Sequence, residues 1–272
     1  MKRFIFSAFI AVTSLMVFFS CNGRTGSGQD GVDSLAFDSI KVDTTMALAD
    51  DTAGPHCHIK LCLTYAKGAK ADAINDSIIR SGVLSPDFLS ITDKHLTVEE
   101  AVDSFVTKYL TDYRKFYGDL YQADKSNSAS YTCEYMLNSH ISQDNPDYYT
   151  YLADVYNYMG GAHGSSIVIA RNVRVKDNKL VTLKDLFVPG YEKGLQEAII
   201  KKMCDMNEVA DLKALSAKTT IFDGIDVYVS DNFIIGKKSI TFIYSPDEIA
   251  CHAVGEIRVE VSNDDIEKLF KK

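Results

Sequence analysis

The sequence predicts an α+β fold in which a largely antiparallel sheet packs with separate helices, as one compact unit of two parts. Two observations predict this class. Several segments alternate apolar and polar residues, which is typical of strands with one buried face. These segments cluster along the chain and do not alternate regularly with helices, as they would in a parallel α/β protein. Helices and strands therefore segregate in the expected fold.

The expected helices have clear local signals. Thr97-Val98-Glu99-Glu100 is a capping box, in which the threonine and the glutamate satisfy each other's backbone amides. Apolar residues three or four apart follow it and predict a helix that ends near Tyr121. Asn263 is expected to cap a last short helix. The other expected helices cover 69–79 and 191–203, and the expected strands cover 58–65, 131–138, 148–159, 166–175, 179–183, 225–229, 240–244 and 257–261.

Residues 1–20 have the organisation of a secretory signal. Lys2 and Arg3 precede an apolar run that is a little short for a membrane span. The small residue Ser20 stands directly before Cys21, as lipoprotein processing requires. We therefore expect Cys21 to be the lipidated N-terminus of an exported protein, anchored in the cell envelope on the periplasmic or outer-membrane face. Ordinary cleavage nearby, with Cys21 an idle thiol, is the alternative.

Residues 21–54 are rich in Gly, Asp, Ser and Thr, and contain one aromatic residue. This composition predicts a flexible acidic tether, because little apolar surface is available for burial. Removal of residues 1–20 takes two of the 29 basic residues and none of the 37 acidic ones, which leaves a net charge near −10. An acidic chain without a basic stripe is a poor candidate for nucleic-acid binding.

The glycine-rich run 158–164 is the most distinctive segment of the chain. Gly160, Gly161 and Gly164 predict a sharp structural turn between two strands, because glycine permits positive φ and close backbone approach. His163 lies in this turn. A histidine between glycines is accessible for proton transfer, but it is equally suited to locking the turn through hydrogen bonds to backbone carbonyls.

Three motifs carry a resemblance to the RsiV-like domain family. They are Gly160-Gly161-Ala162-His163-Gly164, Leu183-Lys184-Asp185-Leu186-Phe187, and Ser245-Pro246-Asp247-Glu248-Ile249-Ala250. The resemblance implies that 160–272 form an RsiV-like domain and that 55–159 form the module found before it in PdaC-like proteins. It also implies a lysozyme-like protein as partner, since a family member of the anti-sigma type binds lysozyme. We expect neither a sigma-binding segment nor a deacetylase domain here.

The leading hypothesis is a non-enzymatic, lipid-anchored envelope protein that binds a lysozyme-like protein. Peptidoglycan or glycan binding is the alternative, and a hydrolase that uses His163 is third. We expect no cofactor and no metal, because His56 and His58 face away from Cys57 on a strand and no second ligand pair has zinc-site spacing. Eleven of the 15 tyrosines lie between residues 109 and 158, and tyrosine suits a partner surface as well as a core. The candidate partner-binding residues are Tyr113, Tyr117, Tyr158, His163, Tyr244, Asp247 and Glu248.

Overall fold

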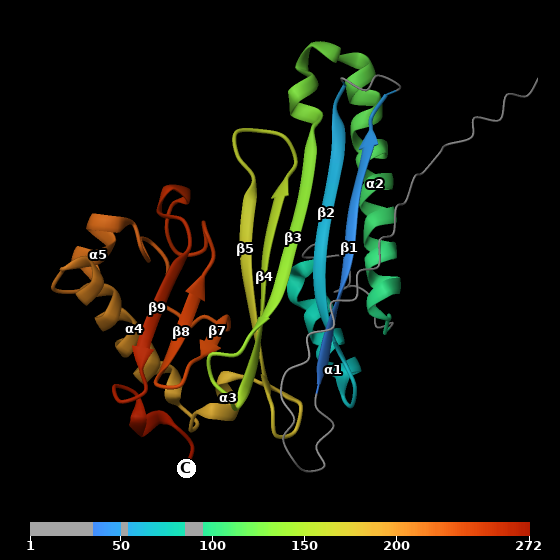
Figure 1. Ribbon diagram of the computed structural model, residues 1–272. Coiled ribbons are helices and arrows are strands. Elements are labelled where there is room, and N and C mark those ends of the chain that lie inside the picture. Colours follow the sequence, from blue (N-terminus) through green and yellow to red (C-terminus); the bar gives the residue numbers. More distant parts are fainter. Residues whose placement is uncertain (1–34, 50–53, 85–94) are drawn as a thin grey trace, which may run out of the picture.

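The computed structural model describes residues 35–49, 54–84 and 95–272, and its larger sheet has six strands in sequential order (Figure 1). Neighbouring strands are antiparallel except for β2 and β3, which run parallel. The α+β class predicted from the sequence is confirmed. The strands of this sheet are β1 (Ala36–Ala47), β2 (His56–Lys67), β3 (Cys133–Ser142), β4 (Tyr148–Tyr158), β5 (Ser165–Arg174) and β6 (Lys179–Val181).

Helices between β2 and β3 make the crossover that a parallel pair requires. These are α1 (Ala71–Ile78), the π-helix η1 (Ile79–Val83), α2 (Val98–Ala123) and the 3₁₀ helix η2 (Lys125–Tyr131). The expected capping box opens α2: the Glu100 amide donates to Thr97 Oγ1 at 3.2 Å, and the Thr97 amide donates to Glu100 Oε2 at 3.0 Å. Helices α1 and α2 cover one face of the sheet, where they enclose the first core with side chains such as Ile59, Leu61 and Phe105.

The second part of the chain builds a smaller sheet with its own core. Its antiparallel strands are β7 (Phe233–Ile235), β8 (Ser239–Tyr244) and β9 (Ile257–Ser262). Side chains of α4, including Leu195 and Ile199, are buried with Phe242 and Val259 of this sheet. The remaining elements are α3 (Leu183–Leu186), α4 (Tyr191–Asn207), α5 (Leu212–Thr219) and the 3₁₀ helices η3 (His252–Val254) and η4 (Glu267–Leu269).

The smaller sheet docks at the free edge of β5. The Val168 amide donates to Ser245 Oγ at 3.0 Å, and the Ala170 amide donates to Asn232 Oδ1 at 3.2 Å, so side chains satisfy backbone groups that would otherwise lack a strand partner. A small buried cluster of Leu152, Val168, Ala170, Ile234 and Ile243 fills the space between the sheets. The two parts therefore form one connected unit.

The tether expected over 21–54 is wrong for its second half, because β1 occupies residues 36–47. Ile40 pairs in register with Leu63, and Val42 with Leu61, so β1 adds apolar side chains to the covered face of the sheet. Its other face carries Lys41 and lies in solvent. The polar composition of the segment reflects an edge strand with one wet face. Residues 1–34, with the expected signal and Cys21, lie outside the described residues.

The expected boundary at 159/160 falls on the turn between β4 and β5, inside the six-stranded sheet. Strands β5 and β6 belong to the same sheet as β1–β4, although they follow that boundary in sequence. The second core starts with Val181, at the end of β6. The hydrophobic cores therefore divide the chain about 20 residues later than the glycine-rich turn suggested.

Two smaller expectations are also wrong. Residues 225–229 form no strand, because the carbonyl oxygens of Val227 and Tyr228 accept side-chain donors, Gln196 Nε2 at 2.9 Å and the Tyr244 hydroxyl at 2.9 Å, where a strand would place ladder bonds. Asn263 does not cap a helix. Its carbonyl oxygen accepts from the amide three residues later in a tight turn, and the short helix η4 begins after Ile266.

Candidate functional site

The turn between β4 and β5 requires glycine at specific points. Gly160 and Gly161 have φ of 77° and 104°, in the left-handed region that favours glycine. A Cβ at Gly160 would lie 2.2 Å from the Ser130 carbonyl oxygen, whereas a Cβ at Gly161 would meet nothing within 4 Å. A Cβ at Gly164 would lie 2.4 Å from the ring of Tyr156. Close approach to η2 and to a tyrosine ring therefore fixes two of the three glycines.

Two of the tyrosines predicted to bind a partner instead hold this turn in place. The Tyr158 hydroxyl donates to the Gly161 carbonyl oxygen at 3.0 Å. The Tyr117 hydroxyl, from α2, donates to the Met159 carbonyl oxygen at 3.3 Å. Both rings are partly exposed. The turn is therefore linked to the end of the long helix by a tyrosine that remains partly accessible to solvent.

Tyr113 and Tyr244 were expected on a partner surface, and the structure places both in the cores. Tyr113 is 3% exposed and its hydroxyl donates to the Tyr131 carbonyl oxygen at 2.9 Å; Tyr244 is fully buried. Burial raises the pKa of both phenols. Both side chains pack apolar surface while their hydroxyls find backbone partners, which is how buried tyrosine is usually satisfied. Neither ring is therefore accessible to a partner on the surface.

His163 lies beside a residue that is far away in sequence. Its ring stacks on His252 with centroids 4.1 Å apart and planes at 22°. His252 Nδ1 lies 2.8 Å from Asp247 Oδ2, and His163 Nδ1 lies 3.2 Å from the Gly164 carbonyl oxygen. The first and third family motifs thus meet in one exposed cluster of His163, His252 and Asp247. His163 itself contacts the His252 ring and the Gly164 carbonyl oxygen, whereas the Asp247 carboxylate pairs with His252.

Glu248 is occupied by structural contacts. Its Oε2 accepts from the Ser245 amide at 2.7 Å, and its Oε1 accepts from the Tyr228 hydroxyl at 2.6 Å. Burial, followed by the hydrogen bond to this carboxylate, raises the pKa of Tyr228. The same turn holds Asp247 at φ 65°. Glu248 therefore closes the turn after β8, and Asp247 is the exposed carboxylate of the pair.

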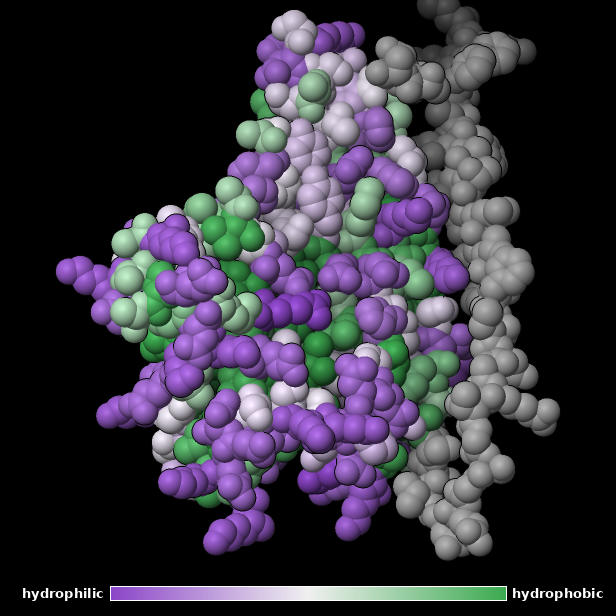
Figure 2. Space-filling model, turned by 60° about the vertical axis from the view of Figure 1, so that its left-hand side comes forward, coloured by the Kyte–Doolittle hydropathy of each residue, from purple (hydrophilic) through white to green (hydrophobic). Residues whose placement is uncertain are grey.

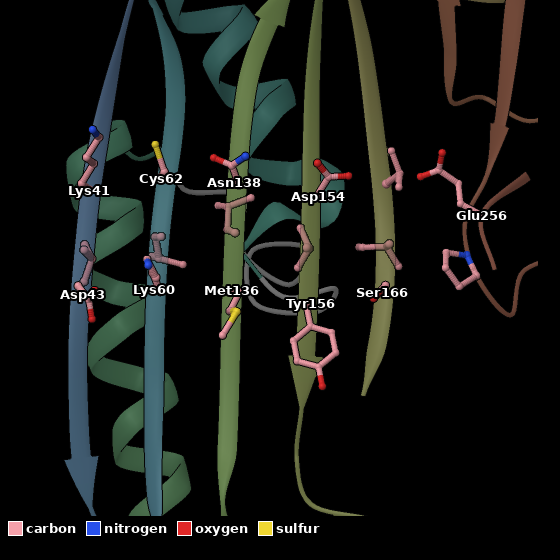
Figure 3. A pocket seen from close by; sticks show the side chains of 17 residues that line it. Lys41, Asp43, Lys60, Cys62, Met136, Asn138, Asp154, Tyr156, Ser166 and Glu256 are labelled. Carbon is pink, nitrogen blue, oxygen red and sulfur yellow. The ribbon is translucent and has the colours of Figure 1, made fainter. Parts of the chain in front are cut away.

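A hollow of about 1000 Å³ lies on the face of the six-stranded sheet opposite α1 and α2 (Figure 3). Its floor comes from alternate side chains of β1 to β5, and Pro246 and Glu256 of the second part form one wall. Met136 and Tyr156 supply apolar surface there, and Met136 is 37% exposed. A hollow of this size lies at the upper end of the usual range for ligand sites.

Charged side chains surround the apolar floor of the hollow. Lys41, Lys60 and Asp43 lie on the β1–β2 side, whereas Asp154 and Glu256 lie toward the second part (Figure 3). The space-filling view in Figure 2 likewise shows hydrophobic residues at mid-height between hydrophilic side chains. An apolar floor with charged groups around it suits the binding of a ligand that is itself partly polar.

None of the seven predicted partner-binding residues lines the hollow. In the alternating segment 131–138, Met136 and Asn138 face away from the helices, but a single exposed apolar side chain is ordinary on a protein surface. The local pattern therefore placed these residues on the uncovered face without indicating a hollow there. What the sequence did not reveal is which other strands lie beside this one.

Within the described ranges, no group of three or more His, Cys, Asp or Glu side chains is arranged to hold a metal ion. His56 and His58 are half-buried on the outer face, and Cys57 is buried on the opposite face. His58 Nε2 instead lies 2.9 Å from Asp43 Oδ1. In the same part of the chain, no helix is long and apolar enough to cross a membrane.

Two family descriptions match this chain. Residues 55–166 match the family described as Deacetylase PdaC, and residues 184–264 match the family described as Protein of unknown function (DUF3298). The two matches together follow the order expected from the sequence motifs. Among curated proteins, none matches the sequence.

Solved structures extend the likeness to most of the chain. A member of the DUF3298 family from Bacteroides fragilis NCTC 9343 has a TM-score of 0.76 and 23% identity, over 88% of this chain and 95% of that one. A DUF3298 family protein from Pseudomonas aeruginosa PAO1 has a TM-score of 0.57 and 16% identity, over the same shares of the two chains. At these identities the likeness shows a shared fold.

Proposed function

We propose that this chain, which joins a PdaC-type segment to a DUF3298 domain, is a non-enzymatic, lipid-anchored binding protein of the cell envelope. Its ligand is a lysozyme-like protein, and the hollow on the uncovered sheet face receives part of it. The observation that carries this proposal is the hollow itself: five strands and the second part line it with apolar floor and charged rim. Such composition is typical of recognition surfaces.

The charge of the chain supports a basic partner. The formal net charge is −8, and an acidic surface attracts a basic protein over distances comparable to the Debye length. The identity of the partner comes from the resemblance to the RsiV-like family. The sequence and the charge therefore suggest the same class of partner by independent routes.

Isothermal titration of the full chain with lysozymes in mild detergent tests the proposal. We expect binding at low salt that weakens at moderate salt. Met136→Glu, which places a charge on the floor of the hollow, should weaken binding at least about tenfold, because an unpaired charge opposes burial against apolar surface. Met206→Glu is the matched control on α4, where Met206 is 56% exposed. No heat at either salt would remove the lysozyme-like partner.

The lipid anchor is tested separately. Cys21→Ser should abolish incorporation of labelled fatty acid. Chains that still lose residues 1–20 should then leave the membrane fraction, whereas chains that keep the signal should stay in it. A lipidated cysteine carries more than one acyl chain, which anchors a protein stably. Unchanged labelling in the variant would show that Cys21 is not the attachment point.

Glycan binding is the second candidate, and one feature of the hollow favours it. The Tyr156 ring lies on the same side as Met136, and the amide of Asn138 and the carboxylate of Asp154 lie in the neighbouring cross-strand row (Figure 3), so a stacking surface and hydrogen-bonding groups share the hollow. Co-sedimentation with purified peptidoglycan tests this candidate. Retention that Tyr156→Ala abolishes, without any binding of lysozymes, would favour a glycan ligand.

Hydrolysis with His163 is the third candidate, and the exposed cluster of His163, His252 and Asp247 is the feature that bears on it. The family name matched by residues 55–166 makes acetylated glycans the first substrates to try. We expect no release of acetate from N-acetylated oligosaccharides. Turnover that His163→Ala removes would overturn the non-enzymatic assignment.

A further inference from the structure

The hollow combines charges of opposite sign at separate positions of one cross-strand row. Pairing in the sheet aligns Lys41 with Cys62, Cys62 with Asn138, and Asn138 with Asp154. These four residues, which we call the central row, run across β1 to β4 on the uncovered face (Figure 3). A cation therefore begins the row and an anion ends it.

A second row lies beside the first and is mainly apolar. Lys60 of β2 pairs in register with Met136 of β3, and Met136 pairs with Tyr156 of β4. Lys60 thus adds a second cation on the same side as Lys41, and the two apolar side chains lie between the cations and the β4 side. A ligand that follows the central row would contact this apolar surface along its length.

The charges of the rows are available for a ligand. Lys41, Lys60 and Asp154 are exposed, and no hydrogen bond or ion pair joins them to other side chains in the described part of the chain. Two other charged groups at the hollow have partners: Asp43 with His58, and Glu256 with Arg258. Asp43 lies in register with Lys60, and His58 offsets its charge only when protonated. The β1–β2 side therefore has two cations and one anion, and Asp154 is the unpaired anion on the β4 side.

We propose that the hollow binds an extended peptide segment that carries an acidic group near Lys41 and Lys60 and a basic group near Asp154. Neighbouring strands are about 4.8 Å apart, so the backbones at the two ends of the central row are about 14 Å apart. An extended segment rises about 3.3 Å per residue. Five residues cover about 13 Å between their first and last Cα atoms, and the first and last side chains then point to the same face, so both charged ends can meet the hollow.

This inference rests on the proposed function, because it uses the same hollow and describes the part of the partner that enters it. It is nevertheless separable. Binding of a whole lysozyme that ignores the charges of the central row would support the proposed function and defeat this inference. Peptide binding without lysozyme binding would support this inference and defeat the lysozyme-like partner of the proposed function.

Cys62 provides a direct measure of occupancy, because it is a free, half-buried thiol in the central row. The experiment labels the full chain in mild detergent with a maleimide and follows each cysteine by peptide mass spectrometry. The probe is the capped pentapeptide Glu-Ala-Ala-Ala-Lys at millimolar concentration, in which both charged side chains share one face of the extended chain. Cys251, which is exposed and outside the hollow, serves as an internal control.

We expect the probe to slow labelling of Cys62 about threefold or more and to leave labelling of Cys251 unchanged. The neutral peptide Gln-Ala-Ala-Ala-Gln should protect much less. Lys60→Met and Asp154→Asn, which keep side-chain size, should each weaken protection about two- to fivefold, as expected for the loss of one solvent-exposed ion pair. Added salt should also weaken protection of Cys62, because it screens exposed charges.

Three outcomes would overturn the inference. The first is equal protection by the charged and neutral peptides. The second is protection that survives Lys60→Met combined with Asp154→Asn. The third is protection of Cys62 by chitooligosaccharides and not by the peptide, which would identify the occupant as a glycan.

Discussion

His163 and His252 stack face to face, with ring centroids 4.1 Å apart, although 88 residues of sequence separate them. The contact joins the turn after β4 to the 3₁₀ helix η3 of the second part. It therefore connects the two halves of the fold at a point where both family motifs are exposed.

The histidine stack should contribute to stability by direct coupling. In a double-mutant cycle with His163→Ala and His252→Ala at pH 8, we expect a coupling energy of about 0.5 to 1 kcal/mol, in the range of other aromatic pairs. Urea denaturation of the four proteins measures it. The same cycle with His163→Ala and His140→Ala, which changes an exposed residue of β3, should give none. A coupling of zero for both pairs would mean that the stack is incidental.

The two glycines with positive φ in the turn should respond differently to alanine. Gly161→Ala meets no atom within 4 Å, so it should cost only about 1 to 2 kcal/mol of backbone strain. Gly160→Ala has the same kind of strain and also places its Cβ 2.2 Å from the Ser130 carbonyl oxygen. We expect it to cost at least about 2 kcal/mol more. Equal midpoints of urea unfolding for the two variants would contradict this.

The capping box at the start of α3 should make the protein less stable at acidic pH. Asp185 Oδ2 accepts from the Thr182 amide at 2.8 Å and from its hydroxyl at 2.7 Å, and these bonds lower the pKa of the Asp185 carboxyl. Because the folded pKa is lower than the unfolded one, the stabilisation is full above about pH 4 to 5 and is lost as the pH falls through the folded pKa.

The variant Asp185→Asn should therefore unfold about 1 kcal/mol more easily at pH 7, as expected for a lost helix cap. Its deficit should shrink as the pH falls through the folded pKa of Asp185, because the native carboxyl then becomes protonated as well. Asp119→Asn on the exposed side of α2 is the control and should show no such dependence. A deficit that stays constant from pH 7 to pH 2 would argue against this role.

The cysteines should differ widely in reactivity, because the thiolate is the reactive form. Burial raises the pKa of Cys57 to about 12 and that of Cys133 to about 11. Cys251 is exposed, and a hydrogen bond with the Thr220 side chain lowers its pKa. Iodoacetamide at pH 7 should thus modify Cys251 first and modify Cys57 and Cys133 only after unfolding. Mass spectrometry of the peptides gives the order, and rapid native labelling of Cys57 would refute it.

Features that depend on near neighbours along the chain could be predicted from local sequence alone. The capping box of α2 is complete within Thr97 to Glu100, and alternation over 131–138 marks β3, because side chains on a strand change face at every residue. The need for glycine in the turn after β4 was likewise readable locally. Local hydrogen bonds and periodicity suffice for such features.

Which segments lie side by side depends on contacts between residues far apart in the sequence. A polar segment at 36–47 became β1 because a strand was available for it to pair with, and residues 225–229 did not become a strand because side chains took their carbonyl oxygens. The hollow depends on the register of five strands. That register is what places Lys41 and Asp154 on the same uncovered face of the sheet. Register is set by long-range packing against the covered face, and for that reason a single sequence read locally does not contain it.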